Sequence, residues 1–352
     1  MPTKIAIFIG DGIGDALFTI PLINFALQQK YDITVIFTSK QPNYKIFDCI
    51  DLPVKQIVLH KSTHARLQLL KKHFNYFDIG ILSVSSESVK NIFISMSIAK
   101  KIYSFRTFPL QGMVNFRYQT RHHTKGHVIQ NNLKLLSEDA ARNWQTYMFV
   151  KALPIDIRNF SLPKSYVVIQ PSSANNIYAH KNWTADGWAE LFSQLKKSFA
   201  NTTFVFIGEA NEQQYIQAIT SAKNCINLMG KTNIQIAAQV VAGATAYIGL
   251  DTGFLHWAVL CNIPTFSLWG GTNPLEYGYK TLNSSKHYII KQQYSCSPCE
   301  SMIAPNRTRV PHHTQCPDFA CMRTLQPSFV LLRVSEFLQT HLNYNINDKA
   351  EC

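Results

Sequence analysis

Long apolar runs and low-complexity stretches are missing from this 352-residue sequence, as are repeats other than two similar α/β halves. No apolar segment approaches the roughly 20 residues that cross a bilayer as a helix, which argues against a membrane-spanning protein. Hydrophobic residues make up 46% of the chain and charged residues 16%, as in folded globular proteins. Met1–Gly10 lacks the long apolar region and cleavage site of a secretory signal, so we expect a cytoplasmic protein of two domains.

Acidic residues are also few. The chain has 21 Asp and Glu against 34 Lys and Arg, which gives a formal net charge of +13. Such an excess of positive charge suits a polyanionic binding partner, such as nucleic acid, an anionic membrane or a phosphorylated glycolipid. Basic residues are dense between Lys61 and Lys125, with aromatics among them, but no nucleic-acid-binding motif accompanies them. We favour an acidic glycolipid at an anionic membrane surface. Single-stranded nucleic acid and a solvated basic face without a ligand are the alternatives.

Apolar runs alternate with helical patterns along the first half of the chain, which predicts a parallel sheet with right-handed crossovers. Expected strands are Lys4–Ile9, Ile33–Thr38, Val54–Leu59 and Asp78–Val84, and expected helices are Asp15–Gln29, Ala65–Phe74 and Val128–Leu136. The segment Ile98–His127 is less regular and is interpreted as loops that contribute to a binding site.

Prolines and polar residues in Lys151–Lys164 interrupt the hydrophobic patterns of both helices and strands, which indicates a domain boundary. A second α/β unit follows, with strands at Tyr166–Ile169, Thr203–Ile207, Asn224–Leu228, Ala246–Gly249 and Thr265–Leu268. Its helices are expected at Ala185–Phe199, Glu212–Ser221, Ile234–Ala242, Phe254–Leu260 and Leu325–His341. Ligands of open α/β sheets bind at the carboxyl ends of the strands.

The most informative turn joins the apolar run Tyr247–Leu250 to the helix that begins at Phe254. Asp251 or Thr252 is placed to cap this helix, and Gly253 lets a ligand approach the backbone closely. The amides of the first helical turn and the helix dipole favour an anion such as a diphosphate, and His256 adds a donor. An ordinary strand–helix junction in which Asp251 only caps is the alternative.

Five motifs resemble those of glycosyltransferase family 9, the ADP-heptose:lipopolysaccharide heptosyltransferases. The segment Asp251–His256, followed by Pro264 and Gly270, resembles the donor-binding signature of that family. Four further matches fall in the family's order: Gly14-Asp15 with Thr19 and Pro21; Gln170–Ser173 with Lys181-Asn182-Trp183; Gly208 with Glu212; and Gly230-Lys231-Thr232. Ser172 stands where the family usually has glycine.

This resemblance implies an α/β fold of the GT-B architecture, with two Rossmann-like domains facing a central cleft. Residues 1–155 would form the N-terminal, acceptor-binding domain. Residues 160–325 would form the nucleotide-sugar-binding domain, with a cysteine-rich insert at 294–323. Residues 326–345 would form a C-terminal helix that packs back on the N-terminal domain.

The resemblance also implies inverting transfer of a heptose or related sugar from an ADP-sugar to a lipopolysaccharide core acceptor. The family transfers without a divalent cation or other cofactor, and no Asp-x-Asp motif occurs here. The enzyme would be cytoplasmic and peripheral to the inner membrane. One alternative is a protein O-heptosyltransferase that modifies autotransporter serines. Another is a non-catalytic nucleotide-sugar-binding or assembly protein, against which the intact Asp15, Lys181 and Asp251 argue.

Asp15 is the candidate general base, since it follows a glycine-rich turn after the first strand and matches the family's proposed catalytic Asp. Asp11 is the competitor, but the spacing to Thr19 and Pro21 selects Asp15. Alternatively, Asp15 is only a helix N-cap. Asp15→Asn should abolish transfer while leaving nucleotide binding nearly unchanged.

The other candidate site residues would bind the donor and stabilise the departing diphosphate. Lys181, with its neighbour His180, would supply positive charge, and a surface lysine with a snorkelling side chain is the alternative. Ser172, Ser173, Thr252 and Gly253 would donate to phosphate. By resemblance, Glu212 would accept from the ribose hydroxyls and Lys231 would lie near the adenine, although Glu212 also suits the first turn of a helix.

Four of the eight cysteines cluster in two close pairs, Cys296 with Cys299 and Cys316 with Cys321. This pattern is typical of a thiolate metal site such as a zinc ribbon, and a reducing cytoplasm disfavours disulfides. The resemblance extends to a similar insert in part of the family, which holds iron in the autotransporter heptosyltransferases. We expect a structural zinc or iron here, with free thiols as the alternative and His312 and His313 as substitute ligands.

Overall fold

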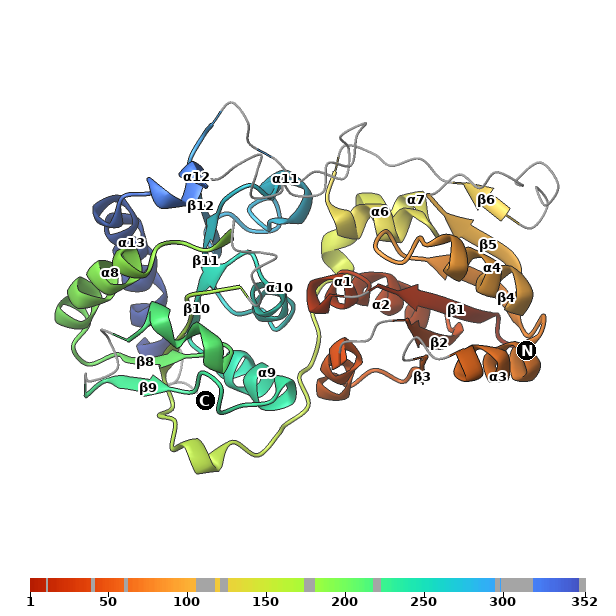
Figure 1. Ribbon diagram of the computed structural model, residues 1–352, viewed down its shortest axis with the longest axis horizontal. Coiled ribbons are helices and arrows are strands. Elements are labelled where there is room, and N and C mark those ends of the chain that lie inside the picture. Colours follow the sequence, from red (N-terminus) through yellow and green to blue (C-terminus); the bar gives the residue numbers. More distant parts are fainter. Residues whose placement is uncertain are drawn as a thin grey trace. The chain divides into compact units, whose positions relative to one another are not determined.

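The computed structural model describes residues 1–10, 12–38, 42–59, 63–105, 118–120, 126–173, 181–217, 223–294, 298 and 319–347. The chain divides into two compact units, Met1–Lys151 and Ala152–Cys352, and each is built on one parallel sheet flanked by helices (Figure 1). No helix within these described ranges has the length and apolar character needed to span a membrane.

The first sheet has the order β3-β2-β1-β4-β5-β6 and is parallel throughout. Its central strands are rich in isoleucine and valine and are buried on both faces, as expected when helices cover both sides. The strands are β1 (Lys4–Ile9), β2 (Asp32–Phe37), β3 (Lys55–Val58), β4 (Phe77–Leu82), β5 (Ala99–Ser104) and β6 (Tyr118–Thr120).

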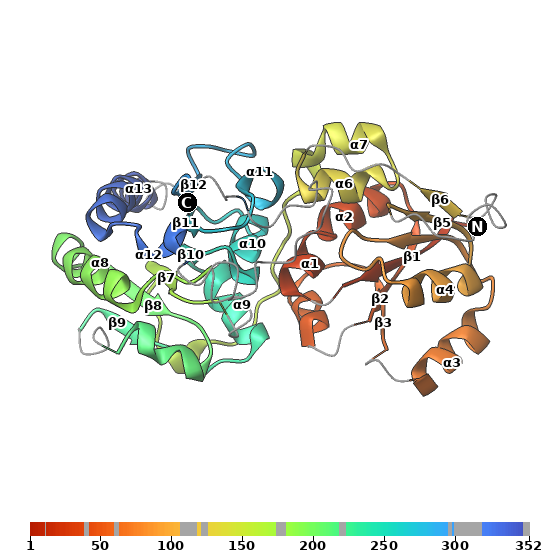
Figure 2. The same cartoon turned by 45° about the horizontal axis from the view of Figure 1, so that its top comes forward.

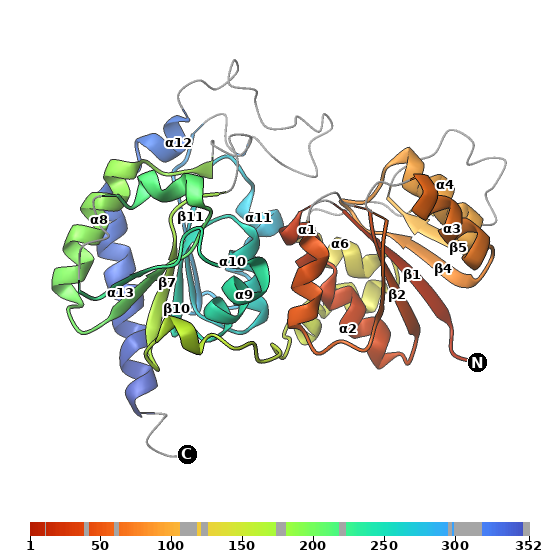
Figure 3. The same ribbon diagram turned by 60° about the horizontal axis from the view of Figure 1, so that its bottom comes forward.

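Helices cover both faces of this sheet (Figure 3). Ala6 and Phe8 of β1 face α3 and α4, and these residues share a buried cluster with Leu69 and Ile92. Helices α2 and α6 lie on the opposite face. The helices are α1 (Ile13–Leu17), α2 (Ile20–Gln28), α3 (Thr63–His73), α4 (Val89–Ile98), α6 (Val128–Lys134) and α7 (Glu138–Arg142), with 3₁₀ turns η1 (Pro42–Cys49) and η2 (Trp144–Tyr147).

Two predictions for the first unit are wrong. The helix expected at Asp15–Gln29 is interrupted, because the Thr19 hydroxyl donates to the Ala16 carbonyl at 2.6 Å and Pro21 has no N–H to continue the ladder. The segment Ile98–His127, interpreted as loops, contributes the strands β5 and β6. The sheet is therefore wider than the sequence pattern indicated.

The second sheet has the order β12-β11-β10-β7-β8-β9 and is also parallel throughout. Helices α8 and α13 lie on one face, and α9, α10 and α11 on the other (Figure 2). The strands are β7 (Tyr166–Gln170), β8 (Thr203–Phe206), β9 (Cys225–Asn227), β10 (Ala246–Leu250), β11 (Thr265–Trp269) and β12 (His287–Lys291).

Six helices and two 3₁₀ turns complete the described part of the second unit: α8 (Ala185–Ser198), α9 (Ile234–Ala242), α10 (Gly253–Leu260), α11 (Pro274–Tyr277), α12 (Ala320–Arg323), α13 (Pro327–Asn347), η3 (Arg158–Phe160) and η5 (Ala210–Tyr215). The α-helix expected at Glu212–Ser221 is wrong, because a 3₁₀ turn occupies its start. Strand β12 was not expected.

The C-terminal helix α13 packs on the sheet of its own unit. Val330, Val334 and Leu338 are fully buried and belong to the same core cluster as Phe266 of β11. The Trp183 indole donates to the carbonyl of Leu325 at 3.0 Å, which ties the start of this region to the segment before α8. Contact of this helix with the N-terminal domain stays a prediction.

Candidate functional site: the start of helix α10

The turn between β10 and α10 leaves the start of the helix without a side-chain cap. Thr252 occupies the N-cap position with an extended backbone, but its hydroxyl does not accept from the helix. It donates instead to Oε1 of Gln170 at 2.7 Å. Gly253 and Phe254, at the helix start, are half-buried. The first-turn amides, with the positive end of the helix dipole, therefore suit an anionic ligand.

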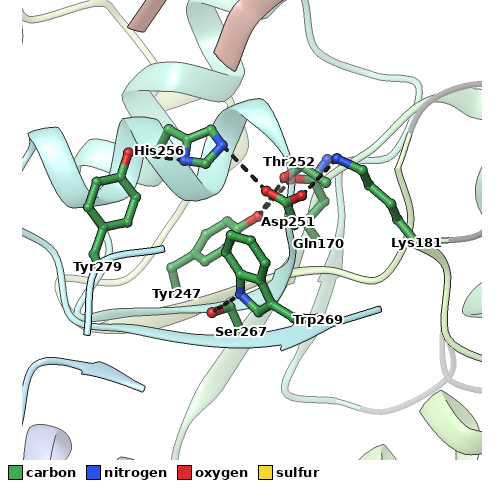
Figure 4. Close-up of polar contacts among 9 residues, drawn as sticks. All are labelled: Gln170, Lys181, Tyr247, Asp251, Thr252, His256, Ser267, Trp269 and Tyr279. Carbon is green, nitrogen blue, oxygen red and sulfur yellow. Dashed lines mark hydrogen bonds and ion pairs between the residues drawn. The ribbon is translucent and has the colours of Figure 1, made fainter. Parts of the chain in front are cut away.

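Asp251 does not cap the helix either, because its carboxylate is held by two basic side chains (Figure 4). The Lys181 ammonium lies 2.7 Å from Oδ2, and Nε2 of His256 lies 3.5 Å from Oδ1. All three side chains are largely buried, with exposed fractions of 15% for Lys181 and 5% for each of the others. Lys181 is thus a largely buried, ion-paired residue and not a snorkelling surface lysine.

The surroundings of Asp251 favour its ionised, negatively charged form. Burial alone would raise the pKa of the carboxyl, but Lys181 and His256 outweigh burial and hold the pKa of Asp251 well below its usual range. Burial lowers the pKa of His256, against the opposing effect of Asp251. The ring of His256 also has Nδ1 at 3.1 Å from the buried Tyr279 hydroxyl. Tyr279, His256, Asp251 and Lys181 therefore form one continuous polar chain.

Gln170 organises the other side of the turn. As the last residue of β7, it lies beside β10, and its Oε1 accepts from both Thr252 and Tyr247 at 2.7 Å. Together these contacts hold Thr252 in the extended conformation that opens the helix end. Gln170 and Tyr247 were not among the predicted site residues. The signal that points to Gln170 is a polar residue at the carboxyl end of a strand beside the strand of Asp251.

The segment after β7 is anchored next to this chain. The backbone N–H and the hydroxyl of Ser173 both donate to Oδ1 of Asn182, at 2.7 and 2.8 Å. Trp183 is buried in the core and fixes the backbone that carries Lys181. Ser173 and Lys181 are therefore held near each other, although the Ser173 hydroxyl is directed to Asn182 and not to an open ligand position. His180 lies outside the described residues.

Glu212 follows the carboxyl end of β8, and Asp251 follows the carboxyl end of β10 in the same parallel sheet. Its Oε2 accepts from the Glu209 N–H at 2.8 Å. Burial raises the pKa of Glu212, and the hydrogen bond from the Glu209 amide opposes this effect. Within the described part of the chain, Oε1 of Glu212 has no hydrogen-bond partner. A buried carboxylate oxygen in this state suits a ligand hydroxyl donor.

Two glycines allow the backbone to close over Glu212. Gly208 has φ +154°, and a Cβ there would lie 2.9 Å from Oε2 of Glu212. Gly230 has φ +72°, and its N–H donates to the Gly208 carbonyl at 2.8 Å. Both positions therefore require glycine. Lys231 follows immediately and is exposed.

Asp15 lies in the first unit, in the turn that follows β1. It is the third residue of α1, and its Oδ2 accepts from the Gly12 N–H at 3.1 Å. The alternative that Asp15 is the N-cap is therefore wrong in detail, since Gly12 is the N-cap and Asp15 reaches back to it. The Asp15 side chain is half-buried. The competitor Asp11 lies outside the described residues.

Most of the cysteine cluster cannot be placed. Cys296, Cys299 and Cys316 lie outside the described residues, as do His312 and His313. Cys321 is half-buried at the start of α12. Within the ranges that the structure describes, no group of three or more His, Cys, Asp or Glu side chains is arranged to hold a metal ion. The metal site stays a prediction.

A sequence model of glycosyltransferase family 9 (heptosyltransferase) matches residues 67–308, well over half of the chain. This chain belongs to glycosyltransferase family 9. Its relatives include lipopolysaccharide heptosyltransferase 1 of Pseudomonas aeruginosa, which is 23% identical over 154 residues, or 42% of each chain. The match thus spans less than half the length of that curated relative.

Solved structures show the same fold as this family 9 chain. E. coli ADP-heptose lipopolysaccharide heptosyltransferase II has a TM-score of 0.69 and 17% identity, over 96% of this chain and 99% of that one. The iron-containing dodecameric glycosyltransferase TibC of enterotoxigenic E. coli has a TM-score of 0.55 and 16% identity, over 96% of this chain and 77% of that one. The predicted fold class, α/β with the GT-B architecture of two Rossmann-like domains, is confirmed.

Proposed function

We propose that this chain is an inverting glycosyltransferase that moves a heptose from ADP-heptose to a lipopolysaccharide core acceptor. The observation that carries the proposal is the buried chain Lys181–Asp251–His256 at the uncapped start of α10. Membership of glycosyltransferase family 9 and the similarity to lipopolysaccharide heptosyltransferases support the sugar and the acceptor.

The donor diphosphate would bind at the start of α10. The first-turn amides donate to its oxygens, and the helix dipole favours its negative charge. The Lys181 ammonium donates to Oδ2 of Asp251 at 2.7 Å. Asp251 thereby orients Lys181 before the donor arrives, which lowers the cost of ordering this long side chain on binding. The amides and Lys181 would then stabilise the charge that develops on departing ADP.

The nucleoside end would bind beside β8. The buried Glu212 carboxylate has an oxygen suited to accept from a ribose hydroxyl. Gly208 and Gly230 bring the two adjoining loops together above it, and Lys231 lies on the exposed side of this pair. A buried carboxylate that hydrogen-bonds vicinal hydroxyls is the usual ribose contact of Rossmann-like folds.

The first unit would bind the acceptor and supply the base. Asp15 lies after the carboxyl end of β1, where open α/β sheets hold their ligands. Its carboxylate would take the proton of the acceptor hydroxyl as that oxygen attacks C1 of the heptose. The C1–O bond to the diphosphate breaks in the same step, ADP leaves with the electron pair, and the configuration at C1 inverts. Lys181 and the α10 amides provide the positive charge and dipoles for this step without a divalent cation.

The proposal also includes the location of the enzyme and a second possible acceptor. We place the enzyme in the cytoplasm, peripheral to an anionic membrane, in keeping with its net charge of +13. An autotransporter protein acceptor is the second candidate, and the cysteine cluster favours it. A nucleic-acid partner is not proposed.

The cysteine cluster would hold a structural zinc or iron that takes no part in transfer. Elemental analysis of the full chain, purified without a metal-affinity step, should find about one zinc or iron per chain, because paired thiolates bind these metals tightly. Less than about half an equivalent would contradict this assignment and would favour free thiols.

Donor specificity can be tested by thermal unfolding with nucleotides. ADP at millimolar concentration should raise the unfolding temperature more than UDP or GDP, because a ligand at 100 times its Kd adds about 2.7 kcal/mol to the stability of the folded state. The Lys181→Met variant should lose most of the ADP shift. Lys197→Met, at an exposed position of α8, is the matched control and should keep it. The absence of a shift with every nucleoside diphosphate would contradict the proposed function.

A further inference from the structure

Helices α3 and α4 present apolar side chains to the outside of the first unit. Leu67 and Phe74 of the α3 segment have exposed fractions of 53% and 71%, and Val89 and Phe93 of α4 have 43% and 51%. Val89 and Phe93 are four residues apart and lie on one side of α4, and Phe74 directly follows the last residue of α3. Other residues of the two helices, such as Leu69 and Ile92, belong to the buried core.

Exposed lysines accompany these apolar side chains. Lys71 and Lys72 occupy the last turn of α3, and Lys90 occupies the first turn of α4, next to Val89. All three are exposed. Lysine side chains at such positions lie along apolar neighbours and keep the ammonium at the polar boundary.

Acidic side chains do not neutralise this surface. The described residues 63–105 contain two carboxylates, Asp78 and Glu87. Asp78 is held by Lys100 at 2.8 Å and by the Lys4 N–H at 2.9 Å. Glu87 is buried and accepts from the Ser104 hydroxyl at 2.8 Å. The exposed charge of the two helices is therefore positive.

The two helices form one surface. They contact each other and lie on the same side of the first sheet (Figures 1 and 3). We define the α3–α4 face as the exposed side chains Leu67, Lys71, Lys72, Phe74, Val89, Lys90 and Phe93. This face combines apolar side chains with positive charges only. An ordinary solvated surface instead mixes positive and negative charges.

We propose that the α3–α4 face docks the protein on an anionic phospholipid bilayer. Its apolar side chains would enter the boundary between headgroups and acyl chains, and its lysines would contact the lipid phosphates. The inference rests on the proposed function to the extent that a lipid-linked acceptor gives the docking a purpose. It identifies the part of the chain that meets the membrane.

Vesicle co-sedimentation of the full chain tests this proposal. The wild-type chain should bind vesicles of equal parts phosphatidylglycerol and phosphatidylcholine, and bind pure phosphatidylcholine much more weakly. Lys71→Glu/Lys72→Glu should lower the binding constant for the anionic vesicles by about 25-fold or more, since each lysine near such a surface contributes about fivefold. Phe93→Glu should lower it by about tenfold, because a charge replaces an inserted aromatic ring.

Matched controls come from the second unit. Lys196→Glu/Lys197→Glu alters two adjacent exposed lysines in the last turn of α8, and Phe329→Glu alters an exposed aromatic residue of α13. Both should bind anionic vesicles within about threefold of wild type. If the controls lose binding as strongly as the α3–α4 variants, general charge and not this face would account for it, and the proposal would be overturned.

Other outcomes would also overturn the proposal. Equal binding of wild type to neutral and anionic vesicles would do so. So would a dimer in light scattering that Phe93→Glu converts to a monomer, because a second copy would then cover the face. The vesicle assay contains neither donor nor acceptor, so its result stands apart from the proposed transfer. Transfer to a water-soluble core oligosaccharide should be unchanged in the α3–α4 variants, whether or not they bind vesicles.

Discussion

Asp15→Asn should lower the turnover number for heptose transfer by about 100- to 10,000-fold, the usual contribution of a general base. The amide cannot take the proton of the acceptor hydroxyl. Binding of ADP should change by less than about twofold, because Asp15 belongs to the first unit and the nucleotide is expected in the second. Steady-state kinetics of ADP release, together with calorimetric titration of ADP, measures both quantities.

The structure explains why asparagine is the informative replacement. Oδ2 of Asp15 accepts from the Gly12 N–H at 3.1 Å, and an asparagine oxygen can accept the same bond. Asp15→Ala loses that bond as well, so it should also lose about 1 kcal/mol of stability. Asp139→Asn, at an exposed position of α7, is the matched control and should transfer like wild type. Turnover of Asp15→Asn within tenfold of wild type would exclude Asp15 as the base.

Lys181→Met should both stop transfer and destabilise the second unit. It removes the cation that would face the departing diphosphate. It also leaves the buried Asp251 carboxylate with His256 alone, and breaking a buried ion pair costs about 3–5 kcal/mol. Urea unfolding at pH 7, followed by the fluorescence of the buried tryptophans Trp183, Trp188, Trp257 and Trp269, measures the loss.

The pH dependence separates this charge effect from a packing effect. The pKa of Asp251 is held below its unfolded value of about 3.9. The ion pair therefore contributes its full stability above that value and loses it as the pH falls further, because the unfolded chain then binds a proton that the native chain does not. Without Lys181, burial should raise the pKa of Asp251 above its unfolded value. The native variant then takes up a proton as the pH falls from 7 to 4, so its loss of stability relative to wild type should become smaller over this range.

The double variant Lys181→Met/Asp251→Asn provides the second control. Without a buried unpaired charge it should recover part of the lost stability, yet it should still fail to transfer. A stability gap that is constant with pH, or a double variant no more stable than Lys181→Met, would show that Lys181 matters for packing and not for its pairing with Asp251.

The sequence predicted the central strands well because they are continuous apolar runs. The strands β5, β6 and β12, at or near a sheet edge, were missed, although the edge strands β3 and β9 were predicted. In β5 two exposed lysines, Lys100 and Lys101, interrupt the apolar pattern, and in β12 a buried histidine begins the strand. The break between α1 and α2 depends on the hydrogen bond of Thr19 to its own helix, which the helical periodicity does not reveal.

The candidate site, like the fold, was predicted only in part. The turn at Asp251 was found because it combines a strand end, a glycine and a helix start. The side chains that complete it come from distant parts of the chain: Lys181 lies 70 residues before Asp251, and Gln170 lies 82 residues before Thr252. Only the strand order, which places β7 beside β10, brings them together. The contact of His256 with Tyr279 likewise depends on tertiary packing, and it was not expected.

The most direct test of the proposed function is to follow ADP release from ADP-heptose by the full chain, with and without a lipopolysaccharide core saccharide. The proposed mechanism predicts release that depends on the acceptor, and a product whose new glycosidic bond has the opposite anomeric configuration to the donor. Release at the same rate without an acceptor, or a product that retains the donor's configuration, would contradict it.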